Sequence, residues 1–189
     1  MMKYLKMVGA LVGLALGLAG CIGSDDPLIT ELNTDFKSFV VGSDSEADKI
    51  SERYSLIIRK GDLYEIDGDL FKMAKLSGRF YVSEVKMGRL YAFTFLERSG
   101  DNLIVHGVHE PDNITSPALK AAVMAYWNED DSVYKMTSMS DVVSMGHLLM
   151  QYRDKINSKP LEFYEEGSAE FERLRDLILA EQAAEKAKE

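Results

Sequence analysis

The amino-acid sequence predicts an α+β fold: an antiparallel β-meander or small barrel of about five to seven strands, followed by two or three packing helices. Strand-like segments recur from about residue 50 to 110, and turns containing glycine separate them at about ten-residue spacing. From about residue 117 to 187, apolar residues instead recur at helical spacing. Strands joined by such short turns pair antiparallel, because a parallel connection needs a long crossover.

Composition and charge describe a folded, acidic protein. Of its 189 residues, 46% are hydrophobic and 28% are charged, which is typical of a globular domain. The net charge of −9 argues against nucleic-acid binding and against electrostatic docking on anionic lipid. A single cysteine excludes an intrachain disulfide and a multi-cysteine metal site.

Residues 1–20 have the organisation of a signal peptide. Lys3 and Lys6 precede an apolar run, Met7 to Ala19, which ends in small residues. This run of 13 residues is too short to cross a membrane as a helix, because a spanning helix takes about 20 residues. We therefore expect residues 1–20 to direct export and to be removed from the mature protein.

The end of this segment, Leu18-Ala19-Gly20-Cys21, resembles the lipobox of bacterial membrane lipoprotein precursors. The resemblance covers about the first 21 residues, in position, flanks and all four residue types. It implies that a diacylglycerol is attached to the sulfur of Cys21, that a peptidase cuts before Cys21, and that a further acyl chain such as palmitate joins the new amine. Two or three chains anchor a protein stably, whereas one binds only marginally. The alternative is a secreted protein with a free thiol.

Cleavage before Cys21 would leave a mature chain of 169 residues with a net charge of −11, because Lys3 and Lys6 are lost. In lipoproteins of Gram-negative bacteria, an aspartate after the cysteine tends to retain the protein in the inner membrane. Ile22 stands there, which favours the outer membrane, facing the periplasm, if the cell is Gram-negative. Residues 21–35 are small, polar and acidic, and we expect a lipidated N-terminus and flexible tether before one globular domain, residues 36–189.

Six segments of the β-rich part are predicted strands: residues 53–60, 63–67, 70–76, 79–85, 89–97 and 102–108. Both faces of the central strands are fairly apolar, whereas a sheet with one wet face would alternate more cleanly. The sheet therefore either curls into a small barrel or is covered by helices on its second face. Before these strands, we expect core contacts from four apolar residues, Phe36, Phe39, Val40 and Val41.

Helices are predicted over residues 116–127, 140–156 and 167–189. Ser140 is the expected N-cap of the middle helix, and Pro160 is expected to end that part of the chain. Residues 132–136 are predicted to form one more short strand. The last helix is expected to fray from Glu181 onward and to bury four apolar side chains, Phe171, Leu174, Leu177 and Ile178.

Two clusters have the residue types of metal ligands. His106, His109 and Glu110 could bind zinc, but strand residues three apart face opposite ways, so one ion could be shared only if the strand ended near Gly107. Thioethers and imidazole suit copper(I), and four methionines lie near His147, namely Met136, Met139, Met145 and Met150. Core or surface roles are favoured for both clusters, and we predict no metal and no cofactor.

The aromatic face of Tyr91, Phe93 and Phe95, with Phe80 or Tyr81 beside it, could line a ligand pocket in a small barrel, but plain core is favoured. The sequence holds no G-x-S-x-G, P-loop or G-x-G-x-x-G motif, and no catalytic residue is predicted. We therefore predict a non-catalytic, lipid-anchored protein of the cell envelope that presents a binding surface to an envelope protein. The alternative is a carrier that holds an apolar or lipid ligand inside a small barrel; an enzyme ranks third.

Overall fold

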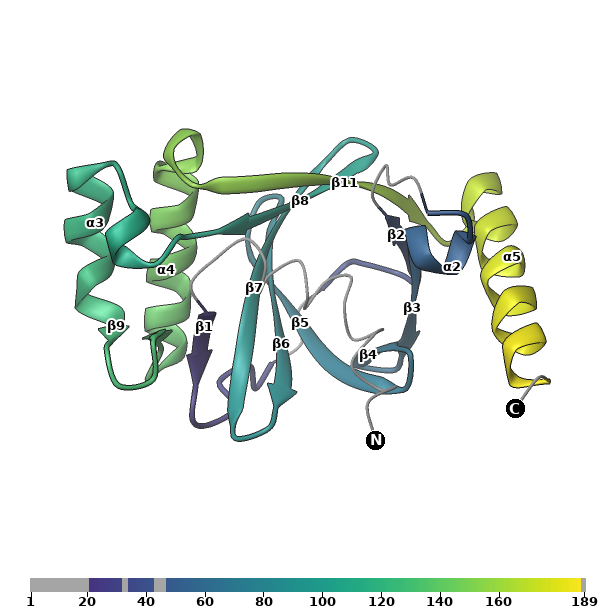
Figure 1. The fold of residues 1–189 in the computed structure, drawn as a ribbon, viewed down its shortest axis with the longest axis horizontal. Helices are drawn as coiled ribbons and strands as arrows, with labels where there is room; N and C mark the ends of the chain where they lie inside the picture. The colour runs from purple at the N-terminus through teal and green to yellow at the C-terminus, as the bar shows by residue number, and fades with distance from the viewer. Residues whose placement is uncertain (1–20, 32–33, 43–46, 188–189) are drawn as a thin grey trace.

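A computed structural model describes residues 21–31, 34–42 and 47–187 (Figure 1). Its central feature is a closed antiparallel barrel, in the strand order β6-β5-β4-β3-β2-β11-β8-β7, with β7 pairing back to β6. The barrel strands are β2 (Phe39–Gly42), β3 (Tyr54–Lys60), β4 (Leu63–Ile66), β5 (Asp69–Ser77), β6 (Phe80–Met87), β7 (Leu90–Ser99), β8 (Asn102–Gly107) and β11 (Asn157–Glu165). The predicted α+β fold with an antiparallel barrel is confirmed, but the barrel alone has eight strands, more than expected.

The six predicted strands, β3 to β8, follow one another as hairpins around the barrel. Their turns need residues that adopt a positive φ without strain. Gly61 between β3 and β4 has φ 64°, and Gly100 between β7 and β8 has φ 59°. These local signals fix where each strand ends, and they account for the agreement with the sequence.

Strands β2 and β11 close the barrel, and neither is predicted as a strand from the sequence. β11 runs through Pro160, the residue expected to end this part of the chain. It pairs with β8 over residues 157–162 but with β2 only over residues 162–165. Pro160 therefore lies where no described strand pairs with the second edge of β11, so its missing N–H costs no hydrogen bond to a described strand.

Three further strands extend the sheet from one side of β7. β1 (Cys21–Ser24) pairs antiparallel with β7 and parallel with β10 (Val133–Lys135), which pairs in turn with β9 (Trp127–Asn128). β1 lies beside Tyr91 and Ala92 in β7, whereas β8 pairs with the later part of β7, from Phe95 onward. The sheet therefore forks at β7 into the barrel and a small extension. The expected short strand at 132–136 is β10.

Residues 21–31 belong to the fold, although their small, polar and acidic sequence predicts a flexible tether. Ile22 and Ser24 are buried in β1, and Ile29 is 1% exposed. The N–H groups of Leu28 and Ile29 both donate to the buried carboxylate of Glu84, each at 2.8 Å. Two apolar side chains and two backbone donors thus find partners in the core, which outweighs the polar composition around them. The predicted signal peptide, residues 1–20, lies outside the described residues.

The helices lie on two opposite sides of the barrel (Figure 1). The described residues hold four α-helices: α2 (Ile50–Arg53), α3 (Pro117–Val123), α4 (Met139–Gln151) and α5 (Ala169–Lys186). Helices α3 and α4 cover the outer face near β7, and their contacts form a second hydrophobic cluster, which we call the outer cluster. Helix α5 and the short α2 pack on the opposite side, against β2 and β3. Among the described residues, no helix has the length and apolar character needed to cross a membrane.

Three details of the helices differ from the predictions. The N-cap of α4 is Ser138, whose hydroxyl accepts from the N–H of Asp141, and not Ser140. In α5, Leu177 is 39% exposed, because the face that packs on the barrel is narrower than the apolar stripe. The helix does not fray at Glu181, because that carboxylate accepts hydrogen bonds from the N–H groups of Ile50 and Ser51 in α2.

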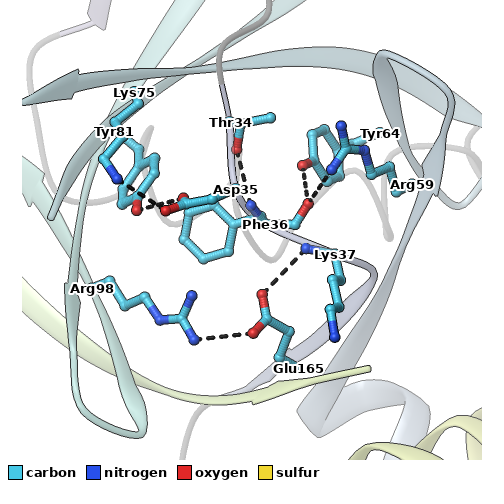
Figure 2. A network of polar contacts seen from close by, with 10 residues as sticks. All are labelled: Thr34, Asp35, Phe36, Lys37, Arg59, Tyr64, Lys75, Tyr81, Arg98 and Glu165. Atoms are coloured by element: carbon cyan, nitrogen blue, oxygen red, sulfur yellow. Dashed lines mark hydrogen bonds and ion pairs between the residues drawn. The ribbon is translucent and has the colours of Figure 1, made fainter. Parts of the chain in front are cut away.

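The barrel interior is filled by side chains, including one from outside the strands. Residues 34–37, which we call the plug segment, pass through the barrel (Figure 2). The fully buried ring of Phe36 lies 4.5 Å from that of Tyr81 and 5.4 Å from that of Phe163, centroid to centroid. The carbonyl oxygen of Phe36 accepts from Tyr64 Oη at 2.7 Å and from Arg59 Nη1 at 2.9 Å. The expected core contacts of Phe36, Phe39, Val40 and Val41 are confirmed.

The aromatic face considered as a ligand pocket does not line the barrel. Phe93 and Phe95 point outward from β7 into the outer cluster, while Leu96 on the alternate face points inward. Tyr81 lies inside, whereas Phe80 lies outside against His106. The prediction of plain core for Phe93 and Phe95 is confirmed, because α4 covers this face.

Replacing Phe36 by alanine is expected to destabilise the protein by about 3–5 kcal/mol, because a fully enclosed aromatic ring leaves a cavity that rigid strands cannot close. Urea denaturation followed by circular dichroism measures the change. The matched control is Leu179→Ala on α5, where the leucine is 45% exposed and the expected change is within about 0.5 kcal/mol. Equal effects of the two substitutions would show that Phe36 does not fill the barrel.

Candidate functional site

Three adjacent barrel strands place Glu97, His106 and Ser158 together on the outer face. Glu97 lies in β7, His106 in β8 and Ser158 in β11. His106 is opposite Phe95 on one side and opposite Ser158 on the other. Since side chains alternate along a strand, Glu97 shares the outer face with Phe95 and therefore with His106. We call these three residues the relay.

The hydrogen bonds of the relay run from the hydroxyl of Ser158 through His106 to the carboxylate of Glu97. His106 Nε2 lies 3.0 Å from Glu97 Oε2, and His106 Nδ1 lies 2.9 Å from Ser158 Oγ. A carboxylate only accepts hydrogen bonds, so Nε2 carries the proton of the neutral ring and donates it to Glu97. Nδ1 is then an acceptor, and the hydroxyl of Ser158 donates to it.

The inner part of the relay is shielded from water. The side chains of His106 and Glu97 are each 4% exposed, and Phe80 stacks on the imidazole with ring centroids 6.0 Å apart. Arg79 Nη2 lies 2.6 Å from Glu97 Oε1 and balances the buried carboxylate. Ser158, in contrast, is exposed. The relay therefore leads from a buried carboxylate, paired with the exposed Arg79, to a hydroxyl at the surface.

Burial lowers the pKa of His106 below its ordinary value of 6.5. The hydrogen bond to Glu97 and the charge of Glu97 act in the opposite direction, while the positive charge of Arg153 adds to the lowering. The imidazole is therefore neutral near pH 7, the state in which Nδ1 can accept a proton.

A pocket of about 320 Å³ lies next to the ends of β8 and β11 that carry the relay. Its walls include Val108, which follows His106 by two residues just after β8, and Ile156, which precedes Ser158 by two residues just before β11. Polar side chains complete the lining, among them His109, Asn113, Thr115 and Lys155. The relay and the pocket are thus neighbours on one surface.

A second polar network fixes the plug segment (Figure 2). Asp35 accepts hydrogen bonds from Lys75 Nζ at 2.9 Å and from Tyr81 Oη at 2.7 Å, and these bonds lower the pKa of Asp35. Glu165 accepts from Arg98 at 3.0 Å and from the N–H of Lys37 at 3.2 Å. Each of these groups holds the chain around Phe36, so the network supports the fold.

The predicted ligand cluster around His106 is not assembled. β8 does end at Gly107, as a shared ion would require, but His106 is engaged by Glu97 and Ser158, and the carbonyl of His109 accepts from Tyr134 Oη at 2.6 Å. Within the part of the chain that the structure describes, no group of three or more histidine, cysteine, aspartate or glutamate side chains is arranged to hold a metal ion.

Of the four methionines considered for copper(I), Met136 and Met145 point away from His147. Met136 and Met145 are buried in the outer cluster, whereas His147, two residues after Met145 on α4, is exposed. Residues two apart on a helix point in different directions. Packing of the outer cluster therefore accounts for Met136 and Met145.

Cys21, the predicted lipid-attachment residue, is the first residue of β1, and its backbone lies opposite Val133 of β10. The relay was not predicted. Its members come from three strands, and the pairing of His106 with Ser158 depends on β11, for which the sequence gives no clear strand pattern. His106 was considered only as a metal ligand.

No protein-family model, curated protein or solved structure matches this chain.

The folded protein is expected to lose stability as the pH falls below about 6.5, because the unfolded chain then binds a proton that buried His106 resists. The contribution of neutral His106 is complete above that pH and is lost toward the lower pKa of the folded state. Urea midpoints measured between about pH 7.5 and 5 should fall less steeply in His106→Gln than in the wild type. The exposed-histidine control His147→Gln should keep the wild-type slope; parallel slopes for all three proteins would contradict the buried neutral state.

Proposed function

We propose that this chain is the precursor of a lipid-anchored protein of the bacterial cell envelope, and that its barrel domain presents a binding surface to another envelope component. The observation that carries the proposal is Leu18-Ala19-Gly20-Cys21, placed after a basic and apolar segment. The location remains that inferred from Ile22: the outer membrane, facing the periplasm, in a Gram-negative cell.

The position of Cys21 adds a geometric consequence to this proposal. β1 starts at the attachment residue and pairs with both β7 and β10. A lipid on Cys21 would therefore hold the domain close to the membrane surface, without the reach that a flexible tether gives. A partner of this protein must then come within a short distance of the same membrane.

The binding surface in this proposal includes the pocket lined by Asn113, Thr115 and Lys155. A hollow of about 320 Å³ with polar walls has room for a side chain or another small group of a partner. The alternative function, a carrier with its ligand inside the barrel, gains no support, because Phe36 and the surrounding aromatic rings occupy the described interior.

Replacing Cys21 by serine is expected to release the protein from membranes and to abolish incorporation of labelled palmitate in cells, because the thiol is the only cysteine sulfur in the chain. Incorporated palmitate and the distribution of the protein between membrane and soluble fractions are measured in the same cells. The control Cys21→Ser/Ser77→Cys moves the only thiol to an exposed position of β5 and should stay unlabelled. Label that remains on Cys21→Ser would overturn the anchoring proposal.

A photo-reactive residue at Lys155 is expected to crosslink one reproducible envelope protein in intact cells. The same residue at Lys186, at the exposed end of α5 on the opposite side of the barrel, is the control and should not capture that protein (Figure 1). Mass spectrometry identifies the products. Identical product patterns from both positions, or none from Lys155, would count against a binding surface at the pocket.

A further inference from the structure

The relay has the arrangement that nucleophilic catalysis by a hydroxyl requires. A weakly acidic hydroxyl becomes a nucleophile when an adjacent base takes its proton, and the base works when a third group fixes its orientation. Here Ser158 donates to His106 at 2.9 Å, and His106 donates to Glu97 at 3.0 Å. A histidine buried only for packing needs two partners as well, but neither needs to be an exposed hydroxyl beside a pocket.

We propose that Ser158 and His106 form an acyl-transfer site, with Glu97 as the positioning residue, and that the adjoining pocket receives the ester of a small carboxylic acid. This goes beyond the binding role proposed above and does not depend on lipid attachment. It would replace the expectation of a non-catalytic protein.

The proposed reaction uses only groups on this surface and water. His106 Nδ1 takes the proton of Ser158 as Oγ bonds to the ester carbonyl carbon, and the same proton then passes to the departing alkoxide as its C–O bond breaks. Water, deprotonated by His106, next attacks the acyl-Ser158 ester. The acid leaves, and the proton on His106 returns to Ser158 Oγ, which restores the starting state. In many serine hydrolases Nε2 faces the serine; here Nδ1 does, which leaves the proton transfers unchanged.

The strand that carries Ser158 also offers a donor for the developing oxyanion. The N–H of Phe163 points toward the β8 side, where it donates to Asp101. Alternation along the uninterrupted register of β11 turns the N–H of Ser158 the opposite way, like the nitrogen of Pro160. No described strand pairs with that edge at Ser158. In the proposed reaction, this backbone N–H, on the edge of β11 away from β8, donates to the developing oxyanion.

The test is labelling of the full, membrane-extracted protein by a fluorophosphonate probe, which reacts with activated serines. We expect one label per chain, on the peptide that contains Ser158, and none in Ser158→Ala. His106→Gln should lower the labelling rate by about 100-fold or more, the usual contribution of a general base. Ser77→Ala, which removes an exposed serine of β5, should label like the wild type.

The outcomes separate chemistry from structure. Urea midpoints of all variants show that each is folded. Absence of label on the folded wild type, or label that persists in Ser158→Ala, overturns the proposal.

Hydrolysis of p-nitrophenyl acetate gives the second readout, and loss of turnover in Ser158→Ala is the expected result. Turnover that is unchanged in Ser158→Ala also overturns it. Because Cys21→Ser should retain full labelling, failure of the anchoring proposal is distinguishable from failure of this one.

The positioning role of Glu97 has its own readout in the pH profile. The charged groups that face His106 are Glu97, its partner Arg79, and Arg153. Labelling should fall as His106 becomes protonated at low pH. Glu97→Gln removes the negative charge that favours the protonated ring, so the fall should move to lower pH while the plateau rate drops by at least about tenfold. A lower plateau with an unmoved profile would indicate a structural role alone.

Discussion

Closure of eight strands around the ring of Phe36 determines the path of the chain on both sides of the barrel. The ring enters the barrel from the plug segment, so the chain must pass from β1, across Glu84, into the interior and out again as β2. The closing strand, β11, must then pair with both β8 and β2. Residues that follow Cys21 closely are thereby built into the core, and the proposed anchor and the domain become one unit.

The same closure sets the chemistry of the outer face. The register of β11 against β8 places Ser158 opposite His106, and a slip of one residue would turn Ser158 away from the imidazole. Packing of Phe80 and the ion pair with Arg79 keep His106 and Glu97 out of water, while Ser158 remains at the surface. A buried, oriented imidazole and an exposed hydroxyl arise here from strand pairing together with these side-chain contacts.

The elements that the sequence predicts are those whose bounds depend on nearby residues. The hairpins β3 to β8 are visible because turn residues such as Gly61 and Gly100 mark their ends, and α4 and α5 are visible from their apolar stripes. Partners far along the chain decide the structure of β2, β11 and the plug segment. In β11, Pro160 predicts the end of an element, although the strand continues through it. The relay brings residues 97, 106 and 158 together through the pairing of β11 with β8, so no sequence motif predicts this site.

Amide hydrogen exchange on the mature protein shows whether the residues next to Cys21 belong to the core or form a tether. We expect the amides of β1, Leu28 and Ile29 to exchange as slowly as those of β6 and β7, because opening any of them exposes the same packed interior. Exchange of residues 22–29 at the rate of an unfolded chain, while β6 and β7 stay protected, would contradict this expectation.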